Sequence, residues 1–168
     1  MKIQDYTEEL INLRRHFHQY PELALQEVET SAYIRIYLEK LGYTVTAVEP
    51  TGLIAELPCL KKREKLIILR AEMDALPIQE QTGLPYASVN QGCMHACGHD
   101  MILAAALILA KIVAEEQETF PVRMRFLFEP AEEIGEGAKR MIQAGALKDP
   151  RPDAFLMFHY AADMTLGM

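Results

Sequence analysis

The spacing of apolar residues predicts helices in the first quarter of the chain. Tyr6, Leu10, Leu13 and Phe17 recur every three or four residues, which indicates an amphipathic helix over residues 7–20 with Thr7 as its N-cap. A second apolar face, made by Ile34, Tyr37, Leu38 and Leu41, predicts another helix that ends at Gly42. Both helices would bury one side and expose the other.

Strand patterns follow, and they alternate with helical ones. Residues 43–48 alternate, residues 51–52 read as a turn and residues 53–57 as a second strand of a hairpin. The continuous apolar run at 66–69 is typical of a central strand covered on both faces. A helix that is apolar on nearly every side is expected over 101–116, a strand over 122–128, a helix over 135–147 and a last strand over 153–158. This alternation predicts an α/β layered domain with a mostly parallel or mixed central sheet flanked by helices.

Composition narrows the range of partners. The chain has 168 residues, of which 50% are hydrophobic, and this suits one compact domain. A net charge of -7 excludes a broad basic surface, so we expect no nucleic acid partner. The acidic start of the chain lacks the cationic segment of a signal peptide, and residues 101–110 are too few to span a membrane. We therefore expect a cytoplasmic protein without a membrane partner. Because three cysteines cannot all pair within one chain, at least one is a free thiol.

Polar clusters follow three of the predicted strands. Residues 72–74, residues 129–133 and His159 each come directly after an apolar run, and residues 95–100 precede the buried helix. In layered α/β domains functional groups gather at the carboxyl ends of strands, so we expect these clusters to meet. Together they offer thiolate, imidazole and carboxylate groups, which are ligands of a divalent transition metal.

Cys97 and His99 are separated only by Gly98, and this spacing allows both side chains to turn toward one ion. The spacing alone fits equally well a buried free cysteine beside a hydrogen-bonded histidine. A zinc knuckle built from Cys93, His95, Cys97 and His99 is a weaker alternative, because no second ligand pair follows.

Glu132 and Glu133 form the most informative acidic pair. In an irregular segment two adjacent carboxylates project in different directions, so one can bind a metal while the other reaches an activated water. Without the other clusters, an acidic first turn of the next helix would explain them better. His159 alone would also be read as a core residue.

Five stretches together resemble one family. They occur at residues 14–27 (RRHFHQYPELALQE), 71–78 (AEMDALPI), 93–101 (CMHACGHDM), 128–138 (FEPAEEIGEGA) and 158–160 (FHY). In order and spacing they are similar to successive motifs of the aminoacylase/carboxypeptidase family of dinuclear metal-dependent amidohydrolases. That family includes hippurate hydrolases, N-acyl-amino-acid amidohydrolases and N-acetyldiaminopimelate deacetylases.

The resemblance implies a zinc-exopeptidase-like fold and roles for particular residues. Cys97, His99, Glu133 and His159 would bind two divalent ions, zinc or manganese first and cobalt or nickel as alternatives. Glu132 would be the general base, and Asp74 would orient the ligands, as would Asp100. The implied reaction is hydrolysis of the amide bond of an N-acyl amino acid or small peptide, and a homodimer of the full-length protein is compatible with it.

The chain departs from the family in four respects. Glu72 stands where Asp is common, Glu129 where Gln is common, and Ile102 where His is typical. The fourth is length, since family members continue with a lid or dimerisation domain and a returning segment that carries a further ligand histidine. Residues 1–168 are therefore expected to be the N-terminal portion of the catalytic metal-binding domain, incomplete at the C-terminus and weakly active or inactive by itself. The alternative is a truncated, non-catalytic metal-binding or assembly module of the same lineage.

Overall fold

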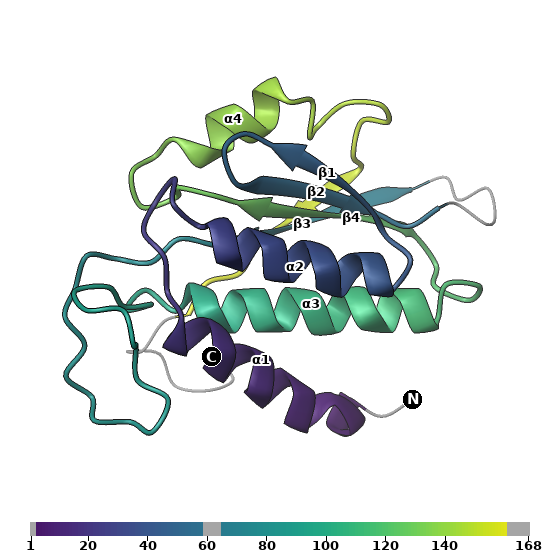
Figure 1. Ribbon diagram of the computed structural model, residues 1–168. Coiled ribbons are helices and arrows are strands. Elements are labelled where there is room, and N and C mark those ends of the chain that lie inside the picture. The colour runs from purple at the N-terminus through teal and green to yellow at the C-terminus, as the bar shows by residue number, and fades with distance from the viewer. Residues whose placement is uncertain (1–2, 59–64, 161–168) are drawn as a thin grey trace.

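A computed structural model describes residues 3–58 and 65–160, and within them one mixed five-stranded sheet forms the centre of the molecule (Figure 1). The strands are β1 (Thr44–Val48), β2 (Gly52–Glu56), β3 (Leu66–Glu72), β4 (Arg123–Glu129) and β5 (Ala154–Leu156). Their order across the sheet is β1-β2-β4-β3-β5. β2 runs antiparallel to β1 and β4, whereas β3 runs parallel to β4 and β5. The carboxyl ends of β3, β4 and β5 therefore meet at one edge of the sheet.

Helices cover both faces of this sheet. They are α1 (Thr7–Gln19), which follows a 3-10 turn at Ile3–Tyr6, α2 (Val28–Lys40), α3 (His99–Glu115) and α4 (Gly137–Gln143). α2 and α3 lie on one face, α1 packs on the outer side of α3, and α4 lies on the opposite face (Figure 1). The structure confirms the expected α/β layered fold with a mixed sheet. Within the described part of the chain, none of the helices combines the length and the apolar character that a membrane span requires.

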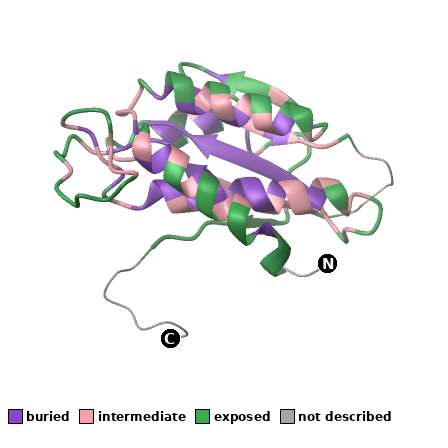
Figure 2. Ribbon diagram, turned by 60° about the horizontal axis from the view of Figure 1, so that its bottom comes forward, coloured by how far each residue is buried: buried purple, intermediate pink, exposed green. Residues whose placement is uncertain are grey.

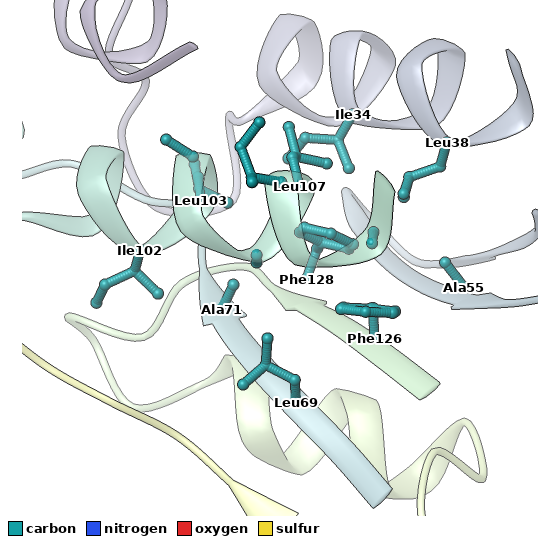
Figure 3. Close-up of a cluster of buried hydrophobic side chains, with 14 of the residues drawn as sticks. Ile34, Leu38, Ala55, Leu69, Ala71, Ile102, Leu103, Leu107, Phe126 and Phe128 are labelled. Atoms are coloured by element: carbon teal, nitrogen blue, oxygen red, sulfur yellow. The ribbon is translucent and has the colours of Figure 1, made fainter. Parts of the chain in front are cut away.

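The larger core lies between the sheet and the layer of α2 and α3 (Figure 3). Phe126 and Phe128 of β4 point into it and are almost completely buried, as is Leu107 of α3. Ile102 belongs to the same cluster and is 1% exposed. An apolar side chain at this position therefore fits its surroundings, although the family typically has histidine there.

α3 is nearly encircled by protein, as its sequence predicts. Ten of its residues are buried, and Figure 2 shows it beside the buried strands of the sheet. The helix begins directly after Gly98, which has φ of +89° and is the N-cap. A residue with a side chain would be strained in this left-handed conformation, so glycine permits the abrupt entry from the loop into the helix.

The structure corrects three details of the predicted elements. Thr7 is not the N-cap of α1: the preceding 3-10 turn continues into the helix, so the cap position falls on Tyr6, which makes no side-chain capping bond. The helix expected over 135–147 is reduced to α4, because Gly135 and Gly145 adopt positive φ and end regular helical geometry. β5 covers only Ala154–Leu156 of the strand expected over 153–158, and it is exposed. Residues 59–64, which include the third cysteine, Cys59, lie outside the described residues.

Candidate metal centre

A polar cleft lies at the edge of the sheet where the parallel strands end. It has a volume of about 410 Å³, which is within the range of small-molecule sites. The residues that line it come from β3, the loop before α3, the segment after β4 and the segment after β5: Arg70, Glu72, Cys97, Glu132, Glu133, Met157, Phe158 and His159. The polar clusters that were expected to meet at the strand ends therefore do meet, around this cleft.

Two overlapping groups of side chains in the described residues have the geometry to hold metal ions. One consists of Cys97, His99 and His159, the other of His99, Glu132 and Glu133, and the donor atoms of each group lie within 4.8 Å of one another. The Cys97 Sγ to His159 Nε2 distance is 3.3 Å. His99 Nε2 lies 3.7 Å from Glu132 Oε2 and 3.9 Å from Glu133 Oε1. All five of these candidate residues are brought together, and His99 is common to both groups.

His99 is oriented as a metal ligand would be. Its Nδ1 lies 2.8 Å from the backbone carbonyl of Asp74, which can only accept, so Nδ1 carries a proton and Nε2 is the nitrogen left to bind a metal. Nε2 is buried and has no hydrogen-bond partner among the described residues, and the same is true of Glu133 Oε1. Buried polar atoms are rarely left unpaired, so a cation between these two atoms fits the site.

Cys97 lies in an acidic environment. Partial burial raises the pKa of its thiol to about 11, and the next cause is the neighbouring carboxylate of Glu133. Thiolates bind metals, whereas thiols bind them poorly, and a bound cation would stabilise the thiolate directly. The donor set of sulfur, imidazole and carboxylate thus suits a divalent transition metal.

Asp74 connects two of the candidate ligands. It is fully buried, its backbone carbonyl accepts the bond from His99, and its Oδ2 accepts the backbone N–H of Glu133 at 2.9 Å. This position agrees with the orienting role that the resemblance implies for it. Asp100 contacts a different part of the molecule: its Oδ2 lies 2.7 Å from His18 Nδ1 and 2.9 Å from Arg14 Nε. It anchors the start of α3 to α1.

The zinc-knuckle alternative is not supported. Among the described residues, neither Cys93 nor His95 belongs to a group that could hold a metal. The Cys93 sulfur instead donates to the backbone carbonyl of Pro21 at 3.5 Å. His95 is buried, and burial lowers its pKa to about 4, so it is neutral at ordinary pH.

Sequence reasoning missed two residues that support the site, the buried Glu27 and the half-buried Arg70. Glu27 accepts the backbone N–H of Ala131, directly before the acidic pair. Arg70 bonds to both Glu72 and Glu129, so the two acidic departures from the family pattern contact the same guanidinium. Charged residues at the ends of two apolar strands were the available signal, but only the register of β3 on β4 shows that Arg70, Glu72 and Glu129 meet.

Comparison with known proteins identifies the lineage. Residues 68–167 match peptidase family M20/M25/M40. The chain is 44% identical over 169 residues to the N-acetyl-L-cysteine deacetylase of Bacillus subtilis, covering 99% of this chain and 40% of that protein. It is 39% identical over 163 residues to the N-acetyldiaminopimelate deacetylase of Streptococcus uberis, covering 95% of this chain and 43% of that protein. The chain thus spans less than half the length of these curated relatives.

Solved structures agree with the sequence comparison. The YXEP protein of Bacillus subtilis, described as a dinuclear metal-binding peptidase of the M20 family, superposes with a TM-score of 0.88 at 40% identity, covering 97% of this chain and 45% of that chain. A putative aminohydrolase from methicillin-resistant Staphylococcus aureus gives 0.89 at 39% identity, covering 96% and 43%. The family expected from the five motifs is confirmed: this chain belongs to peptidase family M20/M25/M40.

Proposed function

We propose that this chain is the N-terminal portion of the catalytic domain of a metal-dependent amidohydrolase that cleaves N-acyl amino acids. The observation that carries the proposal is the convergence of Cys97, His99, Glu133 and His159 around one cleft, with Glu132 at its rim. Relatives named deacetylases of N-acetylcysteine and N-acetyldiaminopimelate support an N-acetyl amino acid as substrate. A short peptide is the related alternative, since other members of the family are peptidases.

Cys97, His99, Glu133 and His159 would hold two divalent ions, as the dinuclear neighbour suggests. Zinc or manganese suits this mixed donor set, with cobalt or nickel as alternatives. When bound, the ions would supply Lewis-acid stabilisation of the amide oxygen and an acidic water. The two groups of donors overlap at His99, whose one available nitrogen would bind one ion only, so the remaining donors would be divided between the two ions.

The protein's own residues would orient the site and move the proton. Asp74 holds the tautomer of His99 through its carbonyl and the backbone of Glu133 through its carboxylate. Glu132 is 35% exposed, so its carboxylate borders both the donor groups and the open cleft. From there it would take a proton from the attacking water and return it to the departing amine, and a positioned general base of this kind contributes about 10²–10⁴-fold to the rate.

Metal content and turnover of the full natural protein test this proposal. Glu132→Gln should lower the release of acetate from N-acetyl amino acids by at least about 10²-fold while leaving metal content unchanged. Glu136→Gln is the matched control, because Glu136 is an exposed acid in the same segment that pairs with Arg140 on the surface. It should leave turnover unchanged.

Two results would contradict the proposal: a wild-type protein that binds no divalent ion, or a Glu132→Gln variant as active as wild type. Retained metal affinity without hydrolysis under any metal would instead support the non-catalytic binding or assembly module.

A further inference from the structure

Arg70 occupies an unusual place at the edge of the sheet. It lies near the end of β3 and its side chain is only 14% exposed. In a strand, residues two apart point to the same face, so Arg70 and Glu72 share the face covered by α4. Glu129 is directly opposite Glu72 in the parallel register of β3 and β4. The fold thus gathers one half-buried guanidinium and two buried carboxylates at the metal cleft, which Arg70 and Glu72 help to line.

The contacts of Arg70 use three different nitrogens. Nη1 donates to Glu72 Oε1 at 2.7 Å, and Nε donates to Glu129 Oε2. Nη2 faces Glu132 Oε1 at 3.8 Å. The guanidinium group is rigid and planar, so the two bonds to buried glutamates fix the direction of the third nitrogen. That direction is toward the candidate general base.

The two oxygens of Glu132 face different partners. Oε1 faces Arg70, whereas Oε2 faces His99 Nε2 at 3.7 Å. A glutamate side chain that is about one-third exposed has several rotamers available, and the carboxylate of Glu133, with donor atoms within 4.8 Å, repels it from this position. The guanidinium of Arg70 is a fixed positive charge on the side of Glu132 away from His99. It favours one rotamer of Glu132 and offsets the repulsion.

We propose that Arg70 is a positioning residue that holds the Glu132 carboxylate at the rim of the metal cleft. This inference rests on the proposed function, in which Glu132 moves the proton. It explains how two adjacent glutamates keep separate roles: Glu133 is held through its backbone by Asp74, and Glu132 is held through its side chain by Arg70.

The test compares two variants of the full natural protein, because Arg70→Gln alone leaves two buried carboxylates unpaired and endangers folding. The first is the double variant Glu72→Gln/Glu129→Gln, in which the amide oxygens still accept from Arg70. The second is the triple variant that adds Arg70→Gln. The two differ only at Arg70, and neither has a buried charge at positions 72 and 129.

We expect kcat of the triple variant to fall about tenfold or more below that of the double variant, since small displacements of a reacting group have large kinetic effects. KM, metal content and melting temperature should agree between the two within error, whereas a merely structural role would change the last two. A further background carries Glu72→Gln, Glu129→Gln and Glu132→Gln together. Adding Arg70→Gln to it should not lower kcat further, because Arg70 acts through Glu132.

Equal kcat in the double and triple variants would overturn the proposal. So would a fall in kcat on adding Arg70→Gln that is as large with Glu132→Gln present as without it. If wild type itself shows no turnover, the proposed function fails, and crystal structures of the two variants decide the role of Arg70. Glu132 should remain within 4 Å of Arg70 in the double variant and turn away in the triple variant. An unmoved Glu132 in the triple variant would overturn the positioning role.

Discussion

The buried carboxyl group of Glu27 joins three segments that are distant in sequence. Glu27 has no exposed surface; its Oε2 accepts the hydroxyl of Thr51 at 2.6 Å and its Oε1 accepts the backbone N–H of Ala131 at 2.8 Å. Ala131 is also fully buried and adopts φ of +53°, which is unusual for a residue with a side chain. Glu132 follows immediately. Glu27 therefore stabilises the backbone conformation from which the acidic pair projects.

Substitution of Glu27 by alanine should destabilise the protein by about 3 kcal/mol. The amide of Ala131 would be buried without a partner, which costs about 1–3 kcal/mol, and the lost bond to Thr51 adds about 1 kcal/mol. For a chain of this size about 3 kcal/mol corresponds to a fall in melting temperature of roughly 6–12 °C. Glutamine keeps an oxygen for Ala131 and an amide donor for the hydroxyl of Thr51. Glu27→Gln should therefore remain within about 1 kcal/mol of wild type.

Urea denaturation followed by circular dichroism measures both variants, and titration with zinc reports the site. Glu27→Ala should also weaken zinc binding, because Glu133 moves with the released backbone, whereas Glu27→Gln should not. The reasoning would be refuted if alanine cost less than about 1 kcal/mol. It would also be refuted if glutamine were as damaging as alanine, since charge rather than the two hydrogen bonds would then matter.

Three further substitutions test other parts of the structure. A Cβ on Gly137 would lie 1.7 Å from the carbonyl oxygen of Pro130, so Gly137→Ala should displace the acidic segment and weaken zinc binding in a calorimetric titration; unchanged affinity would contradict this close packing. The hydrogen bond to Asp100 is the largest cause that raises the pKa of His18. Protonated His18 therefore stabilises the folded protein fully below about pH 6.5, and this stabilisation is lost as pH rises through the raised pKa. His18→Gln should therefore lower the urea midpoint more at pH 5.5 than at pH 9, and equal losses would disprove the linkage. Phe128→Ala should cost about 3–5 kcal/mol in the same assay, and a loss below about 1 kcal/mol would show that this core position is not tightly packed.

The elements that the sequence predicted well are those whose pattern is local. The run of apolar residues in α3 and the short apolar run of β3 are each sufficient to specify a buried helix or strand, and both are confirmed. Element ends were less predictable, because they depend on backbone conformations such as the positive φ of Gly145 beyond α4. Thr7 failed as an N-cap for the same reason: the residues before it already form a helical turn.

The place of the candidate site in the fold could be predicted from the sequence, but the contacts that support it could not. The strand-end rule was enough to expect that residues after β3, β4 and β5 meet, because parallel strands end at one edge. It could not indicate that Glu27 reaches Ala131 or that Arg70 faces Glu132. Those contacts require the register between strands and the packing of a distant loop, and neither is encoded in a local pattern.

The candidate ligands differ in how firmly the described protein holds them. His99 begins a buried helix and is bonded to Asp74, and Glu133 is bonded to the same residue through its backbone, so both are preorganised. His159 follows an exposed edge strand, and its closest polar contact is the sulfur of Cys97. Ion binding would therefore begin with donors whose positions are already fixed, and the entropic cost of ordering a ligand would fall mainly on His159. The buried contacts of Asp74 thus hold His99 and Glu133, and the exposed segment after β5 would complete the candidate centre.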